Sequence, residues 1–179
     1  MITEKTTIKF DAIFSDDKAH RFLWKRVWDK EKPVACVIML NPASSTGIKT
    51  DLTSQLVLNN ISNLEIYGGV IIVNLYSKIT TKLNFKCNFP DELNLAENDS
   101  YIQKSAEEAD VVILAWGKGI DTNKQITARV KEVLDLLSAH KDKMKVISDG
   151  EKKSLHPLVP SVRAKWLLVD YEENNEEQQ

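Results

Sequence analysis

This sequence has little cysteine and no excess of basic over acidic residues. Only two of the 179 residues are cysteine, Cys36 in an apolar run and Cys87 in a polar loop, and neither has the spacing of a zinc site. We therefore expect no metal centre and no cofactor. The formal net charge of −2 excludes an overall basic field of the kind that adheres to any phosphate backbone. Any contact with nucleic acid would have to be local.

Long hydrophobic runs and targeting patterns are also missing. No apolar stretch approaches the roughly 20 residues that cross a bilayer, and residues 1–10 are polar rather than signal-like. These features predict a soluble, cytoplasmic protein without membrane contacts, and they leave its oligomeric state open. No G-x-x-x-x-G-K-[ST] sequence is present, so P-loop hydrolysis of ATP is not supported.

Apolar, β-branched runs alternate along the chain with segments of helical spacing. The runs are apolar on both faces, which suits the middle of a parallel sheet, and they cover residues 34–40, 70–75, 111–116 and 144–148. The helical stripes follow residues that cap helix N-termini, namely Asp51, Asn98, Asp99, Asp121 and Thr122. This order predicts a single three-layer α/β/α domain over residues 1–170 with a central, mainly parallel sheet. Residues 171–179 are acidic and are expected to form a disordered tail.

The N-terminal stretch HRFLWKRVW, residues 20–28, alternates aromatic and basic side chains. One interpretation is a half-exposed strand at the edge of the sheet. The other is a local patch in which Arg21 and Arg26 contact nucleic-acid phosphates.

Polar residues stand where the buried runs end. Ligands of open parallel sheets bind beyond the carboxyl ends of the strands, so these residues are candidates for one binding site. Pro42 fixes its own φ and biases Asn41 toward an extended conformation, which directs the amide. The candidates that follow the four runs are Asn41, Pro42, Asn74, Trp116, Gly117, His156, Pro157 and Leu158. Two carboxamides, an imidazole and a glycine turn can read a flat heterocycle by its edges.

The loop after Pro42 adds hydroxyl groups. Ser44 and Ser45, with Thr46 and Gly47, can cradle a phosphate through hydroxyl and backbone N–H groups, and Asp51 follows them as a further binding candidate. A loop rich in serine, threonine and glycine is also an ordinary connection.

Each of the main candidates has a structural alternative. Asn41 and Pro42 can form a turn that caps the next helix, and Asn74 can close its strand through backbone hydrogen bonds. Trp116 can belong to the core, and His156 can be a surface residue. We assign no role to His20 or His140.

Seven segments in order make the sequence similar to the bacterial and phage family known as domain of unknown function 1643. The resemblance covers about residues 20 to 168, and the segments read HRFLWKRVW, IMLNPASS, TDLT, VNLY, ENDSYI, AWGKG and LHPL. This resemblance implies family membership and says little about activity.

The strand ends IMLNP, VIIVN and VILAWG, followed by HPL, more remotely resemble the uracil-DNA glycosylase superfamily. The resemblance implies a fold of that type and catalytic roles for Asn41, which would position a water at the sugar, and His156, which would stabilise negative charge on the departing base. Asn74 would bind the pyrimidine edge. Leu158 would act as a wedge while a base leaves the stack, a step that takes roughly a few kcal/mol.

The sequence departs from the Q-D-P-Y-H branch of that superfamily at the water-activating position, where Asn41 replaces aspartate, and approaches the G-I-N-P-G turn of the mismatch-specific branch. Ala43 replaces an aromatic residue, and HPLVPS replaces HPSPLS. A neutral Asn41 orients water without accepting its proton, so hydrolysis would need another base, and Asp51, Asp99 and Asp149 are the candidates.

Three hypotheses follow. The chain is an enzyme acting on a nucleobase, nucleotide or DNA, with N-glycosidic hydrolysis as its reaction. Alternatively, it binds such a ligand without turnover, or it is an interaction protein from a phage or defence setting.

Overall fold

The computed structural model describes residues 1–45, 48–85, 92–119 and 123–172. Its helices and strands, in chain order, are β1 (Lys9–Phe14), β2 (Arg21–Val27), β3 (Val34–Met39), α1 (Leu52–Asn63), β4 (Gly69–Asn74), α2 (Glu97–Glu108), β5 (Val111–Leu114), α3 (Lys124–Leu136), the 3₁₀ helix η3 (Ser138–Lys143), β6 (Met144–Ser148), the 3₁₀ helix η4 (Pro160–Val162) and β7 (Leu167–Asp170).

Seven strands within these residues form one mixed sheet in the order β1-β2-β4-β3-β5-β6-β7. The four central strands, β4, β3, β5 and β6, run parallel, whereas β1, β2 and β7 pair antiparallel with their neighbours. Each predicted apolar run is one of the parallel strands. The predicted α/β class with a mainly parallel centre is therefore confirmed.

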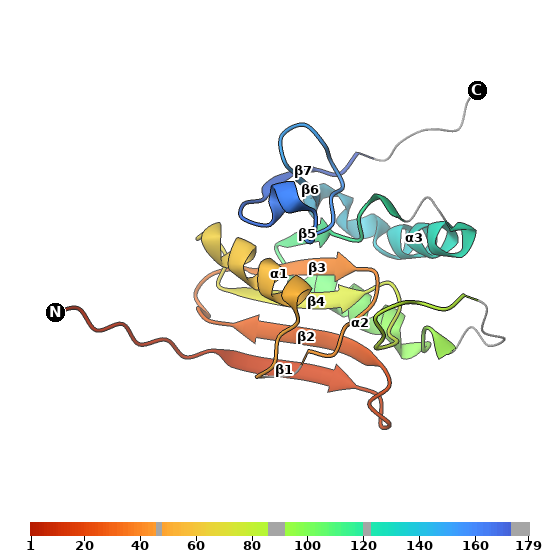
Figure 1. The fold of residues 1–179 in the computed structure, drawn as a ribbon, viewed down its shortest axis with the longest axis horizontal. Coiled ribbons are helices and arrows are strands. Elements are labelled where there is room, and N and C mark those ends of the chain that lie inside the picture. Colours follow the sequence, from red (N-terminus) through yellow and green to blue (C-terminus); the bar gives the residue numbers. More distant parts are fainter. Residues whose placement is uncertain (46–47, 86–91, 120–122, 173–179) are drawn as a thin grey trace.

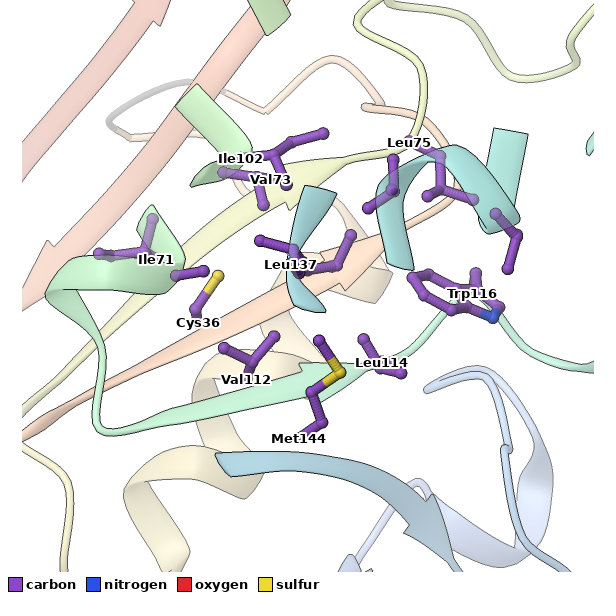
Figure 2. Close-up of a cluster of buried hydrophobic side chains, with 14 of the residues drawn as sticks. Cys36, Ile71, Val73, Leu75, Ile102, Val112, Leu114, Trp116, Leu137 and Met144 are labelled. Carbon is purple, nitrogen blue, oxygen red and sulfur yellow. The ribbon is translucent and has the colours of Figure 1, made fainter. Parts of the chain in front are cut away.

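Helices cover both faces of the sheet because each central strand is apolar on both sides. Val57 and Ile61 of α1 pack with Trp24 and Val37 on one face. On the other face, α2 and α3 bury side chains against Cys36, whose neighbours appear in Figure 2. Figure 1 shows α1 in front of the sheet and α2 behind it. Complete burial raises the pKa of the Cys36 thiol to about 12, so this residue acts as a small hydrophobic side chain.

The helix starts agree only partly with the predicted caps. Asp51 caps α1, as predicted, through a 3.0 Å hydrogen bond from the Ser54 backbone N–H to Asp51 Oδ1. Helix α2 begins at Glu97, which places Asn98 and Asp99 inside its first turn rather than at a cap. Asn123 caps α3. The predicted caps Asp121 and Thr122 lie outside the described residues.

The edge-strand interpretation of HRFLWKRVW is wrong. Strand β2 lies inside the sheet between β1 and β4, and Arg21 is buried. The register with β1 shifts at Phe22, since Ile13 pairs with Leu23 and Phe14 with Arg21. This bulge turns Arg21 to the same face as Trp24, which simple alternation does not anticipate. The predictions for Cys87 and for most of the tail, residues 173–179, fall outside the described residues.

Candidate functional site at the carboxyl edge of the parallel strands

The strand order brings the predicted polar residues to one edge of the sheet. Met39 is in register with Asn74, and Ile38 is in register with Leu114, so Asn41, Asn74 and Gly117 all lie at or just beyond the carboxyl ends of neighbouring strands. The connection after β3 runs through α1 on one face, and the connection after β5 runs through α3 on the other. The carboxyl ends of β3 and β5 therefore flank a topological switch point, where open α/β sheets bind ligands.

Asn41 uses its amide to hold two loops together. Its Nδ2 donates to the Thr80 carbonyl at 2.6 Å and to the Pro42 carbonyl at 3.4 Å, while the Thr80 N–H donates to the Pro42 carbonyl at 3.1 Å. The interpretation of Asn41 as a helix cap is wrong, because Asp51 caps α1. The Asn41 side-chain oxygen stays free of these bonds and can accept one from a ligand or water.

Ser45, Asp51 and Ser54 form a hydrogen-bonded cluster at the N-terminus of α1. Asp51 Oδ2 accepts from the hydroxyls of Ser45 and, at 2.7 Å, Ser54. Burial raises the pKa of Asp51, but the hydrogen bonds from Ser45 and Ser54 outweigh it, so the net pKa is lowered. An ionised carboxylate with this many donors is a poor proton acceptor. Ser44 is exposed beside the cluster.

Arg21 and Asn74 form a buried polar pair next to this cluster. Each side chain is 1% exposed, and Arg21 Nη2 donates to Asn74 Oδ1 at a long 3.5 Å. Within the described residues, Arg21 Nε, Arg21 Nη1 and Asn74 Nδ2 have no hydrogen-bond partner. Burial lowers the pKa of Arg21 to about 10, and the negative charge of Asp51 offsets part of that effect. Three buried polar atoms thus remain unpaired at the carboxyl edge of the parallel strands, which is unusual in a folded protein.

His156 lies against Gly117. The glycine has φ +77°, and a Cβ at this position would stand 2.8 Å from the His156 Cβ, so only glycine fits. His156 Nδ1 accepts a hydrogen bond from the Leu158 N–H at 3.2 Å. Burial lowers the pKa of His156, which favours the neutral ring with its hydrogen on Nε2. Pro157 is buried and Leu158 half-buried in the same loop.

Other predicted site residues make their contacts outside this edge group. Trp116 is a core residue with 8% exposure (Figure 2). Arg26 stacks over Trp24, 4.8 Å from the ring centroid, and donates to Thr50 at 3.0 Å.

His156 has no hydrogen bond to Asn41 or Asn74 within the described part of the chain.

The other two candidate bases, Asp99 and Asp149, are engaged in interactions away from this edge. Asp99 pairs with Arg129 on the opposite face of the sheet. Asp149 lies in a surface turn, where hydrogen bonds from Ser161 and from backbone N–H groups lower its pKa to about 2.

Ser54 belongs to the edge group although it was not predicted. Its position three residues after a capping aspartate was the sequence signal that could have identified it.

Neither a metal cluster nor a membrane span is found in the described ranges. No group of three or more histidine, cysteine, aspartate or glutamate residues there could hold a metal ion. None of the helices described has the length and apolar character of a membrane-spanning segment.

Comparisons with known proteins identify a family and nothing more specific. No curated protein is significantly similar to this chain. Among solved structures, the hetero-hexameric glutamate dehydrogenase from Thermus thermophilus in its leucine-bound form is 12% identical with a TM-score of 0.31. That match covers 79% of this chain and 33% of the dehydrogenase chain, and at such a score it carries no argument. The family described as protein of unknown function (DUF1643) matches residues 21–158, which is most of the chain. The chain therefore belongs to the DUF1643 family.

Proposed function

We propose that this chain binds a nucleobase, carried by a nucleotide or by DNA, at the carboxyl edge of its parallel strands. The observation that carries the proposal is the pair Arg21 and Asn74, whose buried polar atoms lack partners at this edge. Leaving such atoms unpaired costs about 1–3 kcal/mol each, so a ligand that reached them would be stabilised by completing the arrangement. An amide N–H₂ suits a base carbonyl, and a guanidinium suits a base carbonyl or a phosphate.

The arrangement of the motifs supports the same proposal. The four segments that resemble the uracil-DNA glycosylase superfamily lie at the carboxyl ends of β3, β4 and β5 and in the loop after β6, which are adjacent strands. Asn74 and Gly117 stand on either side of β3, so the strands that carry them are about 10 Å apart. A single heterocycle above the end of β3 could therefore bond to Asn74 on one side and to His156 on the other.

N-glycosidic hydrolysis is a second candidate, and the tautomer of His156 favours it. When the bond between the sugar and the base nitrogen breaks, its electron pair moves onto the base. A neutral His156 with its hydrogen on Nε2 can donate a hydrogen bond to the base oxygen that gains this charge, while Asn41 Oδ1 accepts one from the attacking water. Asp51 is already saturated by donors, so the proton of that water would leave slowly.

Binding is tested with free bases and deoxynucleoside monophosphates in equilibrium dialysis against the full chain. We expect Asn74→Ala to weaken binding of the preferred base about tenfold, the value of one lost hydrogen bond. Asn63→Ala, at the exposed end of α1, removes the same group and is the matched control. Equal affinity in the Asn74 variant, or no binding of any base, would contradict the proposal and favour an interaction protein.

Hydrolysis is tested with oligonucleotides that contain uracil, hypoxanthine, xanthine or oxidised and hydroxymethylated pyrimidines, followed by alkali. His156→Ala should abolish strand breaks, whereas His140→Ala, beyond α3 and before β6, should not. Breaks of equal yield in both variants would exclude His156 from the reaction. Uncut strands together with measurable binding would leave recognition as the function.

A further inference from the structure

A second site lies on the face of the sheet that carries α2 and α3. It is an open pocket of about 270 Å³ whose apolar wall consists of Tyr76, Phe85 and Leu93. Tyr76 lies two residues beyond Asn74, the last residue of β4, and packs with the core on the face that carries α2 and α3. At about 30 Å³ per water molecule, the volume equals roughly nine waters, which is enough for a small organic molecule.

The single cation in the described wall of this pocket is already neutralised. Arg129 is 8% exposed, and its guanidinium donates to the Leu75 carbonyl at 2.9 Å, to both carboxylate oxygens of Asp99, and to Glu132 Oε2 at 3.2 Å. Every nitrogen of this guanidinium therefore has an acceptor within the protein. An anionic ligand would find no free positive group on Arg129.

Arg129 and the two carboxylates bonded to it carry a net negative charge. Two carboxylates, Asp99 and Glu132, surround one guanidinium, so these three groups carry a net charge of −1. Glu132 lines the pocket and keeps 65% of its side chain exposed, so its carboxylate can approach a ligand. A positively charged ligand would restore the balance.

The aromatic wall suits a cation as well. The rings of Tyr76 and Phe85 meet at 69° with centroids 5.6 Å apart, which forms a corner. The Tyr76 hydroxyl donates to the Gln125 carbonyl at 3.2 Å and so holds its ring in place. Electron-rich ring faces attract organic cations, and ammonium groups that carry methyl groups also gain apolar contact there.

The start of α3 does not turn this pocket into an anion site. Helix N-termini attract anions through free N–H groups. Here the Asn123 side chain accepts from the N–H groups of Gln125 and Ile126 at 2.8 and 3.4 Å, which uses these donors internally. The side-chain amide of Gln125 lines the same pocket and offers its carbonyl oxygen to a cation, whereas the Asn94 side-chain oxygen already accepts from the Ser77 N–H and from Asn98 Nδ2.

We propose that this pocket binds a small organic cation with a methylated ammonium group, through the aromatic corner of Tyr76 and Phe85 and the carboxylate of Glu132. The site is separate from the base-binding edge and does not depend on it.

Choline, titrated into the ¹⁵N-labelled full chain and followed by NMR, tests the proposal. We expect saturable shifts of the Asn94 and Gln125 side-chain amides. Its neutral isostere 3,3-dimethylbutan-1-ol, which has the same shape without the charge, should bind at least tenfold more weakly. Equal affinity for the two compounds, or no saturable shift with choline, would overturn the proposal.

Two variants locate the site independently. Phe85→Leu keeps an apolar side chain without the ring, and Glu132→Gln removes the charge from a largely exposed position; each should weaken choline binding about five- to tenfold. Glu107→Gln, on the exposed surface of α2, removes the same charge elsewhere and should leave affinity unchanged. If Phe85→Leu fails to fold, Glu132→Gln alone decides. Unchanged binding in Glu132→Gln, or inorganic phosphate as a tight competitor, would refute the cation site.

Discussion

Arg21→Met should make the ligand-free protein more stable while it removes ligand binding. Methionine keeps an unbranched side chain of similar length inside the sheet but brings no charge and no N–H groups. The arginine is 1% exposed and has two guanidinium nitrogens without partners within the described residues. A buried ion that lacks full compensation is often less stable than an apolar side chain of the same size.

The magnitude follows from the surroundings of Arg21. Burial lowers its pKa from 12.5 to about 10, which means that the site disfavours the charged form by roughly 3 kcal/mol. Against this stands one long hydrogen bond to Asn74, which contributes at most about 1 kcal/mol. The difference predicts that Arg21→Met raises the free energy of unfolding by about 2 kcal/mol. For a chain of this length, the melting temperature should rise by roughly 4–8 °C.

Urea unfolding followed by circular dichroism measures this change, first without ligand and then with the preferred base at saturation. At 100 times its dissociation constant, the ligand should stabilise the wild type by about 2.7 kcal/mol and the variant not at all, which reverses the order. Arg21→Lys retains the buried charge and should not be more stable than the wild type. If Arg21→Met is less stable than the wild type by 1 kcal/mol or more, Arg21 is a satisfied structural residue, and the reasoning behind the edge site fails.

Three further predictions concern the residues around this edge. Asp51→Ala removes the cap of α1 and should lower the free energy of unfolding by about 1–2 kcal/mol, measured in urea; a loss below 0.3 kcal/mol, roughly the scatter of such measurements, would contradict the cap. Gly117→Ala should cost about 1–3 kcal/mol, because φ is +77° and the new Cβ meets His156, and it should move the His156 ring signals in NMR spectra; unmoved signals would disprove the contact. Burial lowers the pKa of both His20 and His156 below 6.5, so the unfolded chain binds more protons than the folded one just below that pH. The contribution of these two histidines to the free energy of unfolding should therefore be fully present above pH 6.5 and should decline as the pH falls below it. His156→Gln should reduce the decline in the free energy of unfolding measured between pH 7.5 and 5.5.

The architecture could be predicted because its cause is local in the sequence. Apolar, β-branched runs mark strands that are buried on both faces, and the helical stripes between them require crossover connections. The gathering of Asn41, Asn74 and Gly117 at one edge follows from the same rule, since parallel strands all end on one side.

The contacts of the individual side chains could not be predicted, because they depend on distant partners. The Asn41 amide is held by Thr80, 39 residues away, in a loop that has no motif of its own. The burial of Arg21 depends on the bulge at Phe22 and on β1, whose sequence KFDAIF alternates only weakly. The pocket beside α3 escaped prediction because its walls come from α3 and from scattered residues of the long connection between β4 and α2.

The two outermost strands shield the hydrogen-bonding groups of the strands inside them. Both β1 and β7 lie outside residues 21–158, the segment that matches the family. A fragment restricted to that segment would leave β2 and β6 with open backbone donors and acceptors, and the loss of Phe10 would uncover the Trp24 ring that it contacts at 5.8 Å. Open strand edges beside apolar side chains template aggregation. Lys9 and Asp11, the charged residues that β1 presents to solvent, therefore protect a fold whose candidate site residues all lie further inside.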